Sequence, residues 1–238
     1  KYVAAEDIIV PPGANNTDYT VISAVKCSAP VNVTVKAVLG SSADAYCSDN
    51  SLYVASSGTK DGAVYTSVTS FDISENGLVY KASGSVDGEL VSRYSMTEAD
   101  GKFRIACRAY NENGMMTTNI YTLDSSLGIV SKSEGLLPGI IAGAVKFDGS
   151  YASIFENGAT EPSLVVDLDK TADSADKATG FMAAYVNSFG DDLMVGITSA
   201  DDSLKLELYG SADGVKLNEI SFAQMQGVTS PALTDKKA

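Results

Sequence analysis

The stretch VYTSVTSFDISENGLVYKASGSV, Val64 to Val86, decides the fold because it holds two β-rich runs on either side of the turn sequence SENG. β-branched, aromatic and small polar residues alternate along both runs, which is typical of strands joined by a hairpin. The same shape returns at TNIYTLDSSLGIVSKSEGL, residues 118–136. The recurrence indicates a repeated β unit.

Composition excludes several classes of function. The chain has 238 residues, 45% of them hydrophobic, and a net charge of −13, which argues against binding of nucleic acid or an anionic membrane surface. It contains no His, so triads, ordinary zinc sites and imidazole acid–base chemistry are excluded. It also contains no Trp, the strongest platform for stacking on sugars. We expect an acidic protein that needs no cofactor.

The three cysteines, Cys27, Cys47 and Cys107, form an odd set and no disulfide framework. We expect buried free thiols, with a Cys27–Cys47 bridge as the alternative. No run of eighteen apolar residues is present, so the sequence predicts no transmembrane helix. With Lys1 first and no signal peptide before it, we expect a mature chain.

A tight turn led by Asp recurs at a nearly constant period. Asp-Gly and Asp-Asn tolerate the positive φ angles of two-residue hairpins, so each copy marks an antiparallel turn. Successive copies lie 51, 48, 43 and 44 residues apart. They begin at Asp49, Asp100, Asp148, Asp191 and Asp235.

A second series of strand centres runs beside the first. Its intervals are 48, 50, 45 and 40 residues. Its members are Val25, Ile73, Leu123, Leu168 and Leu208. A unit of four strands with a period in the forties predicts an all-β fold of the β-propeller type.

The repeat defines four complete blades and the parts of a fifth, within one propeller domain, 1–238. The complete units fall at residues 43–92, 93–142, 143–183 and 184–226. The predicted closing blade is composite, with residues 1–42 joined to 227–238, and its second strand comes from KYVAAEDIIV at residues 1–10. This gives five four-stranded blades; the alternative is a section of a larger propeller.

Several segments resemble the secreted β-propeller-domain proteins of bacteria and archaea. The resemblance covers Tyr19 to Ala238 and is carried by SLYVAS, SGSVDGELVSRYSMTEADGKFRIAC, GIVSKSEGLLPG and SPALTDKKA. It implies a secreted or cell-surface propeller of unknown activity in a longer protein. Of the basic residues expected near LLPGIIAGAVKF only Lys146 remains, and Lys236 stands where a His is expected.

The longest loop between second and third strands is CRAYNENGMMTTN, residues 107–119. Aromatic and Met side chains are enriched at the centres of protein interfaces, so this loop is a candidate ligand-binding site. The alternative is that Met115 and Met116 only cover the edge of the blade. With Lys146 added, the candidate residues are Tyr110, Asn111, Glu112, Met115, Met116 and Lys146.

Carboxylates lining a central channel suggest a competing, glycoside hydrolase-like function, because such enzymes use two acids on facing strands. Asp44, Glu98 and Asp148 are the candidates, although Asp148 also belongs to the turn series. The acidic loop DLDKTADSADKA, residues 167–178, departs from a calcium-binding loop at the positions of Thr171, Ala172 and Ala178, so we predict no metal site.

The sequence therefore favours a secreted or surface scaffold without enzymatic activity. Its partners are expected to be surface proteins or glycans, and we expect a monomer. No catalytic residue is assigned.

Overall fold

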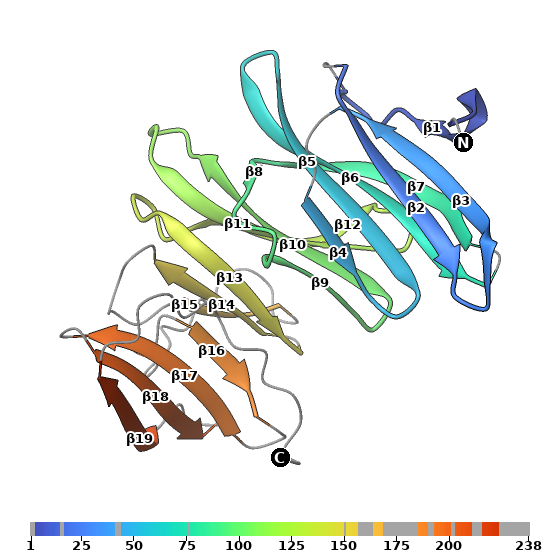
Figure 1. Ribbon diagram of the computed structural model, residues 1–238. Helices are drawn as coiled ribbons and strands as arrows, with labels where there is room; N and C mark the ends of the chain where they lie inside the picture. The colour runs from blue at the N-terminus through green and yellow to red at the C-terminus, as the bar shows by residue number, and fades with distance from the viewer. Residues whose placement is uncertain are drawn as a thin grey trace. The chain divides into compact units, whose positions relative to one another are not determined.

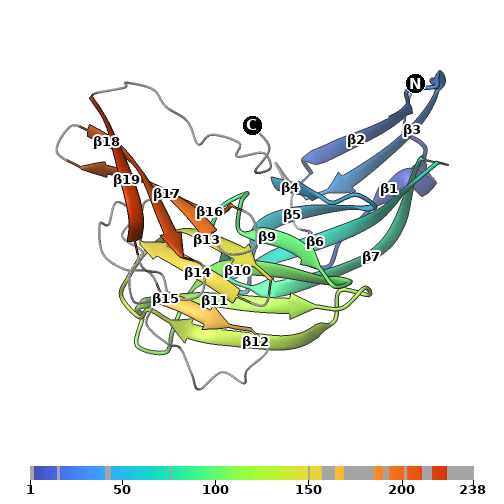
Figure 2. The same ribbon diagram turned by 90° about the horizontal axis from the view of Figure 1, so that it is seen from below.

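The computed structural model of the chain (Figures 1 and 2) is all-β, with one short 3-10 helix at Ala5–Asp7 among the described residues. Contacts divide the chain into two compact units, residues 1–141 with 145–147 and residues 142–144 with 148–238. Each is treated by itself. The described residues are 3–14, 17–40, 44–75, 77–149, 151–156, 164–168, 185–189, 193–200, 203–210 and 216–223.

The first unit opens with a three-stranded N-terminal sheet in the order β1-β3-β2. Strand β2 (Tyr19–Lys26) runs antiparallel to β3 (Ala29–Leu39), as predicted for this blade. Strand β1 (Ile8–Ile9) runs parallel to β3. The prediction that residues 1–10 place a second strand beside β2 is therefore wrong, because the pairing of β1 puts it at the opposite edge.

The next sheet, in the order β4-β5-β6-β7, matches the first predicted repeat unit. Ser74 pairs with Gly77 across the SENG turn, so the stretch that opened the sequence analysis forms the β6–β7 hairpin. All neighbours in this sheet are antiparallel. The strands are β4 (Asp44–Cys47), β5 (Ser51–Lys60), β6 (Ala63–Ser74) and β7 (Gly77–Asp87).

The second repeat unit forms the β8–β12 sheet. Its long strands follow the predicted order, and the short strand β8 pairs with the far end of β10, an addition that the sequence analysis missed. The strands are β8 (Glu89–Leu90), β9 (Met96–Ala99), β10 (Lys102–Tyr110), β11 (Met116–Leu123) and β12 (Ile129–Leu136).

The remaining two sheets follow the third and fourth repeat units. One has the order β13-β14-β15, and the predicted fourth strand of this unit, residues 178–184, lies outside the described residues. The other has the predicted order β16-β17-β18-β19. The strands are β13 (Ala142–Asp148), β14 (Tyr151–Glu156), β15 (Leu164–Asp167), β16 (Tyr185–Ser188), β17 (Leu193–Ala200), β18 (Ser203–Gly210) and β19 (Lys216–Ala223).

The Asp-led turns fall where the series places them. Asp100 and Gly101 have φ angles of 52° and 69°, the positive pair that a two-residue hairpin of this hand requires. Before β5, the backbone N–H of Ser48 donates to the carbonyl of Ser51 at 2.9 Å, although Asp49 there does not adopt a positive φ. The turns at Asp191 and Asp235 lie outside the described residues.

The core of the first unit lies between the β4–β7 and β8–β12 sheets. Alternate residues of β5 and β10 point into it, and the rings of Tyr53 and Phe103 stack with centroids 4.0 Å apart and planes 11° from parallel. Such offset contact adds to the effect of burial itself. The buried cluster comprises Tyr53, Ala55, Val68, Val86, Leu90, Met96, Phe103, Ile105, Cys107, Tyr121, Leu123 and Leu127.

The opposite face of the β4–β7 sheet is buried as well. Val54, Phe71 and Leu78 pack against Val38 of β3, with Ile22 of β2 at the border of the cluster. Strand β5 thus sends odd-numbered side chains to one neighbouring sheet and even-numbered ones to the other. A central sheet with both faces covered explains why β6 is buried continuously from Thr66 to Phe71.

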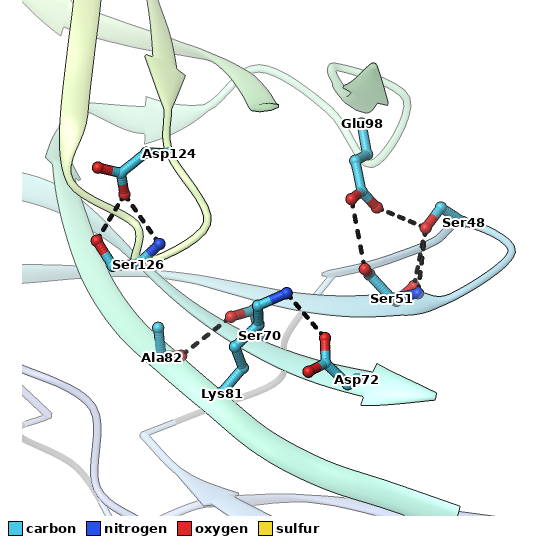
Figure 3. Close-up of polar contacts among 9 residues, drawn as sticks. All are labelled: Ser48, Ser51, Ser70, Asp72, Lys81, Ala82, Glu98, Asp124 and Ser126. Atoms are coloured by element: carbon cyan, nitrogen blue, oxygen red, sulfur yellow. Dashed lines mark hydrogen bonds and ion pairs between the residues drawn. The ribbon is translucent and has the colours of Figure 1, made fainter. Parts of the chain in front are cut away.

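Small hydroxyl side chains make up much of the buried surface of β6. Thr66 donates to the carbonyl of Gly88 at 2.7 Å, and Ser67 donates to that of Ser56 at 3.2 Å. Ser70 donates to the carbonyl of Ala82 at 3.4 Å (Figure 3). Since each hydroxyl reaches a backbone acceptor on a neighbouring strand or turn, the polar layer is satisfied without water.

Replacing Phe103 by Ala tests the core between the two sheets. The side chain is 1% exposed and loses its stacking partner, so we expect the free energy of unfolding to fall by about 3–5 kcal/mol in urea denaturation. Val79→Ala, on the 52% exposed side chain of Val79, is the control and should change it by less than about 0.5 kcal/mol. A loss below about 1 kcal/mol for Phe103→Ala would contradict this packing.

Candidate functional site

The hairpin loop between β10 and β11 brings five of the predicted site residues together. It runs from Tyr110, the last residue of β10, to Met116, the first of β11, and these two are directly paired across the ladder. The loop is short because the strands register up to its base. Sequence position alone therefore placed Tyr110, Asn111, Glu112, Met115 and Met116 on one hairpin tip.

Asn111 organises the loop. Its side-chain Oδ1 accepts hydrogen bonds from the backbone N–H groups of Asn113 and Met115, both at 3.0 Å. Its own N–H donates to the carbonyl of Met115, and Gly114 donates back to the carbonyl of Asn111, both at 2.9 Å. Gly114 has a φ of 72°, a region open to Gly. The loop is thereby fixed from within, by an Asn that mimics a turn of backbone.

The fixed loop presents two large side chains to solvent. Tyr110 is 68% exposed and Met115 is 41% exposed, and Glu112 is exposed beside them. Met116 is only half-buried, and its carbonyl accepts a hydrogen bond from the N–H of Gly139 at 2.8 Å. Met115 therefore does not serve to cover the sheet edge, whereas Met116 is partly covered.

Lys146, the remaining predicted ligand-binding residue, lies on β13 and is half-buried. It comes from a separate strand, later in the chain than the hairpin. Its role in ligand binding stays a prediction.

The three predicted channel carboxylates have different surroundings. Asp44 is exposed at the start of β4. Asp148 ends β13 just before Gly149, whose φ of 53° belongs to the turn, and the surroundings of the Asp148 side chain lie outside the described structure. Glu98, in the middle of β9, is partly buried and has well-defined partners.

The partners of Glu98 are two serines of the preceding sheet (Figure 3). Ser48 Oγ donates to its Oε2 at 2.5 Å, and Ser51 Oγ donates to its Oε1 at 3.4 Å. Burial, together with the charge of Glu98, raises the pKa of the neighbouring Tyr53 hydroxyl to about 12. The Glu98 carboxylate is thus occupied in tying β9 to the turn before β5.

Sequence reasoning missed this role of Glu98. The available signal was the pair of serines that flank the turn Asp49-Asn50, one repeat earlier. Their partner lies about 50 residues away in sequence, on the next sheet, so spacing within a single repeat gives no hint of the contact.

A groove of about 480 Å³ was also missed, because it is built from segments distant in sequence. It lies between the N-terminal sheet and the β6–β7 turn, and Thr34 and Ile73 are among its lining residues. At one end Lys26 Nζ and Glu75 Oε2 form an ion pair of 3.4 Å.

The three cysteines are free. Cys107 is buried, as predicted, and burial raises the pKa of its thiol to about 12, helped by the charges of Asp87 and Glu89. Cys27 and Cys47 are exposed, so the prediction of buried thiols is wrong for these two. Cys47 sits near a sheet edge on the short β4, where the inner face is taken by Tyr46.

Two classes of feature were searched within the described residues. No group of three His, Cys, Asp or Glu residues there is placed to hold a metal ion, and residues 169–178 of the acidic loop fall outside that search. In the same residues, no helix has the length and apolar character needed to cross a bilayer.

Relatives of the chain are uncharacterised archaeal proteins. A protein of Methanocaldococcus jannaschii is 34% identical over 163 residues, 66% of this chain and 26% of that protein. A protein of Archaeoglobus fulgidus is 28% identical over 159 residues, 65% of this chain and 25% of that protein. The chain thus spans about a quarter of the length of these relatives.

Among solved structures, the chain is similar to a subtype N10 neuraminidase-like protein of A/little yellow-shouldered bat/Guatemala. The TM-score is 0.48 and the identity 10%, over 79% of this chain and 70% of that one. At this score the similarity adds nothing to the assignment. The profile of the family described as "Beta propeller domain" matches residues 1–238. The chain therefore belongs to the β-propeller domain family.

Proposed function

We propose that the chain is a non-enzymatic scaffold that binds a protein or glycan ligand through the β10–β11 hairpin loop. The observation that carries this proposal is the loop itself, in which Asn111 fixes the backbone while Tyr110 and Met115 remain exposed. A loop that is ordered before binding loses less conformational freedom when the ligand arrives.

The chemistry of the loop suits a protein surface. Tyr offers a broad apolar ring with a hydroxyl at its tip, and Met adapts its shape to the surface that it meets. Glu112 and Asn113 add polar groups at the rim of the same tip. Aromatic residues at the centre with polar residues around them are the usual arrangement of a binding patch.

The glycoside hydrolase alternative has less support. Such an enzyme needs one carboxylic acid and one carboxylate held about 5–10 Å apart across a substrate. Glu98 is engaged by Ser48 and Ser51, and Asp148 lies beside a turn. Neither observation favours an acid held ready for a sugar.

The proposed architecture has five blades, of which the N-terminal sheet is the incomplete one. Two of the described sheets have four strands in the predicted order, whereas β1, β3 and β2 make three. A full blade at this point requires one more strand beside β2, from outside the described residues. The alternative, a section of a larger propeller, is supported by the greater length of the relatives.

The proposed location is the cell surface or the medium outside the cell. It rests on the resemblance to secreted propeller proteins, and the net charge of −13 suits a well-hydrated surface.

Replacing Tyr110 by Ala tests the binding role. The probes are an array of defined glycans and the purified surface-protein fraction of the source organism, each applied to the immobilised chain. We expect a retained ligand whose affinity falls at least about tenfold in Tyr110→Ala, as for a central aromatic anchor. Tyr94→Ala is the matched control, since Tyr94 is 74% exposed outside the loop. Equal loss in both variants, or no ligand, would refute the loop as the site.

Replacing Glu98 by Ala and by Gln separates the scaffold from the enzyme. As a structural link, Glu98→Ala should lower the free energy of unfolding by about 1–2 kcal/mol, because the partly buried serine hydroxyls lose their acceptor. Glu98→Gln keeps an acceptor oxygen and should cost less. As a catalytic acid, Glu98→Gln would instead abolish glycan turnover at unchanged stability, and that result would contradict the scaffold proposal.

A further inference from the structure

The edge of β2, residues Tyr19–Lys26, is a surface that the fold leaves without a described partner. The strand order β1-β3-β2 puts β2 at the end of its sheet, and among the described residues β3 is its one neighbouring strand. The β2–β3 ladder is regular from Tyr19 to Val25. An edge of this length carries a row of backbone donors and acceptors suited to another strand.

The ladder shows which residues face this edge. The N–H of Gly40 donates to the carbonyl of Asp18 at 2.8 Å, so Asp18 directs its backbone groups toward β3. Direction alternates along an antiparallel pair, and Thr20, Ile22 and Ala24 therefore also bond to β3. The open edge is left with the backbone groups of four residues, Tyr19, Val21, Ser23 and Val25.

Nothing in β2 protects this edge in the usual ways. The strand YTVISAVK contains no Pro, and its single charge, Lys26, stands at the end. The side chains of Tyr19, Val21 and Val25 are 51–57% exposed on the outward face. Natural edge strands of this length normally carry an inward charge, a Pro or a bulge against unwanted pairing.

We propose that the β2 edge pairs with β2 of a second copy of the chain, antiparallel and centred on Ile22. The two copies are then related by a two-fold axis, and each sheet continues into the other. In this register residue numbers on the two strands add to 44. Tyr19 lies opposite Val25 of the partner subunit, and Val21 lies opposite Ser23 of the partner subunit.

This register satisfies the backbone. Its directly opposed residues on the open side are all odd-numbered, and these are the ones whose N–H and C=O groups face the edge. The two strands can therefore exchange hydrogen bonds in closely spaced pairs, as an antiparallel ladder requires. The symmetric arrangement uses the same patch on both copies.

The side chains are also matched to themselves. On the outward face the exposed Tyr19 meets Val25 of the partner subunit, so two exposed apolar groups shield each other. At each end of the shared ladder Asp18 lies opposite Lys26 of the partner subunit. Other registers of two β2 strands do not bring these opposite charges together, so the charges select this one.

Lys26 is able to take part because its contact within the chain is weak. Its ion pair with Glu75 is 3.4 Å long, and the two side chains are 45% and 92% exposed. An exposed pair of this kind holds its members loosely in water. The proposal replaces the expectation of a monomer, which assumed that residues 1–10 cover β2.

Charge reversal at the two ends of β2 tests the proposal. Sedimentation equilibrium of the wild-type chain over a concentration series should give a mass rising from 24.7 kDa to twice that value. Lys26→Asp sets Asp18 against an acid at both ends, and Asp18→Lys sets two lysines together. Each single variant should weaken dimerisation at least tenfold, and the double variant should restore it.

Mixing the two single variants is the decisive control. One copy then carries two acids and the other two lysines, so a mixed pair regains both opposite-charge contacts. We expect the mixture to dimerise although neither variant does so alone. A variant that had merely misfolded would not be rescued in this way, and neither would one that affected only the contact with Glu75.

Amide hydrogen exchange at Val21, Ser23 and Val25 decides among the other outcomes, with Thr20 and Ile22 as internal controls bonded to β3. In the dimer these three amides exchange slowly. A monomer with fast exchange there overturns the proposal, because the edge is open. A monomer with slow exchange also overturns it and assigns the edge to another segment of the chain, such as the predicted closing strand at 227–238. A dimer that ignores charge reversal uses a different surface.

Discussion

The double-sided burial of the β4–β7 sheet is the constraint on which the first compact unit depends. Odd-numbered side chains of β5 enter the core shared with the β8–β12 sheet, and even-numbered ones enter the cluster shared with β2 and β3. Because a strand has a period of two, a slip of one residue would exchange the two faces. The Tyr53–Phe103 stack and the Phe71 cluster together therefore fix the register of the central sheet.

Polar groups within this packing are used for structure, which shifts the search for function to the surface. The hydroxyls of β6 bond to neighbouring strands and turns, and Glu98 is held by Ser48 and Ser51. What remains accessible is a loop fixed by Asn111 and an edge strand with regular pairing on one side only. Both surfaces are suited to association, one with a ligand and the other with a second copy.

Local rules made much of the fold predictable, and non-local contacts account for the differences. The Asp100–Gly101 turn and the SENG hairpin follow from residues that tolerate particular backbone angles, so sequence alone identifies them. The parallel pairing of β1 with β3 joins segments almost thirty residues apart and has no turn signal. The hairpin loop was found from its length, whereas the link from Glu98 to the preceding sheet depends on how two repeats stack.

Thiol labelling of Cys107 tests the central role of the core between the two sheets most directly. Cys107 is buried there with a pKa raised to about 12, while the exposed Cys27 and Cys47 serve as fast internal references. At pH 8 in increasing urea, its labelling should share one free energy and one urea dependence with amide exchange at Val54 and Ile105, one residue from each sheet. Rapid Cys107 labelling that does not depend on urea would mean that the sheets separate without unfolding, and it would contradict this account.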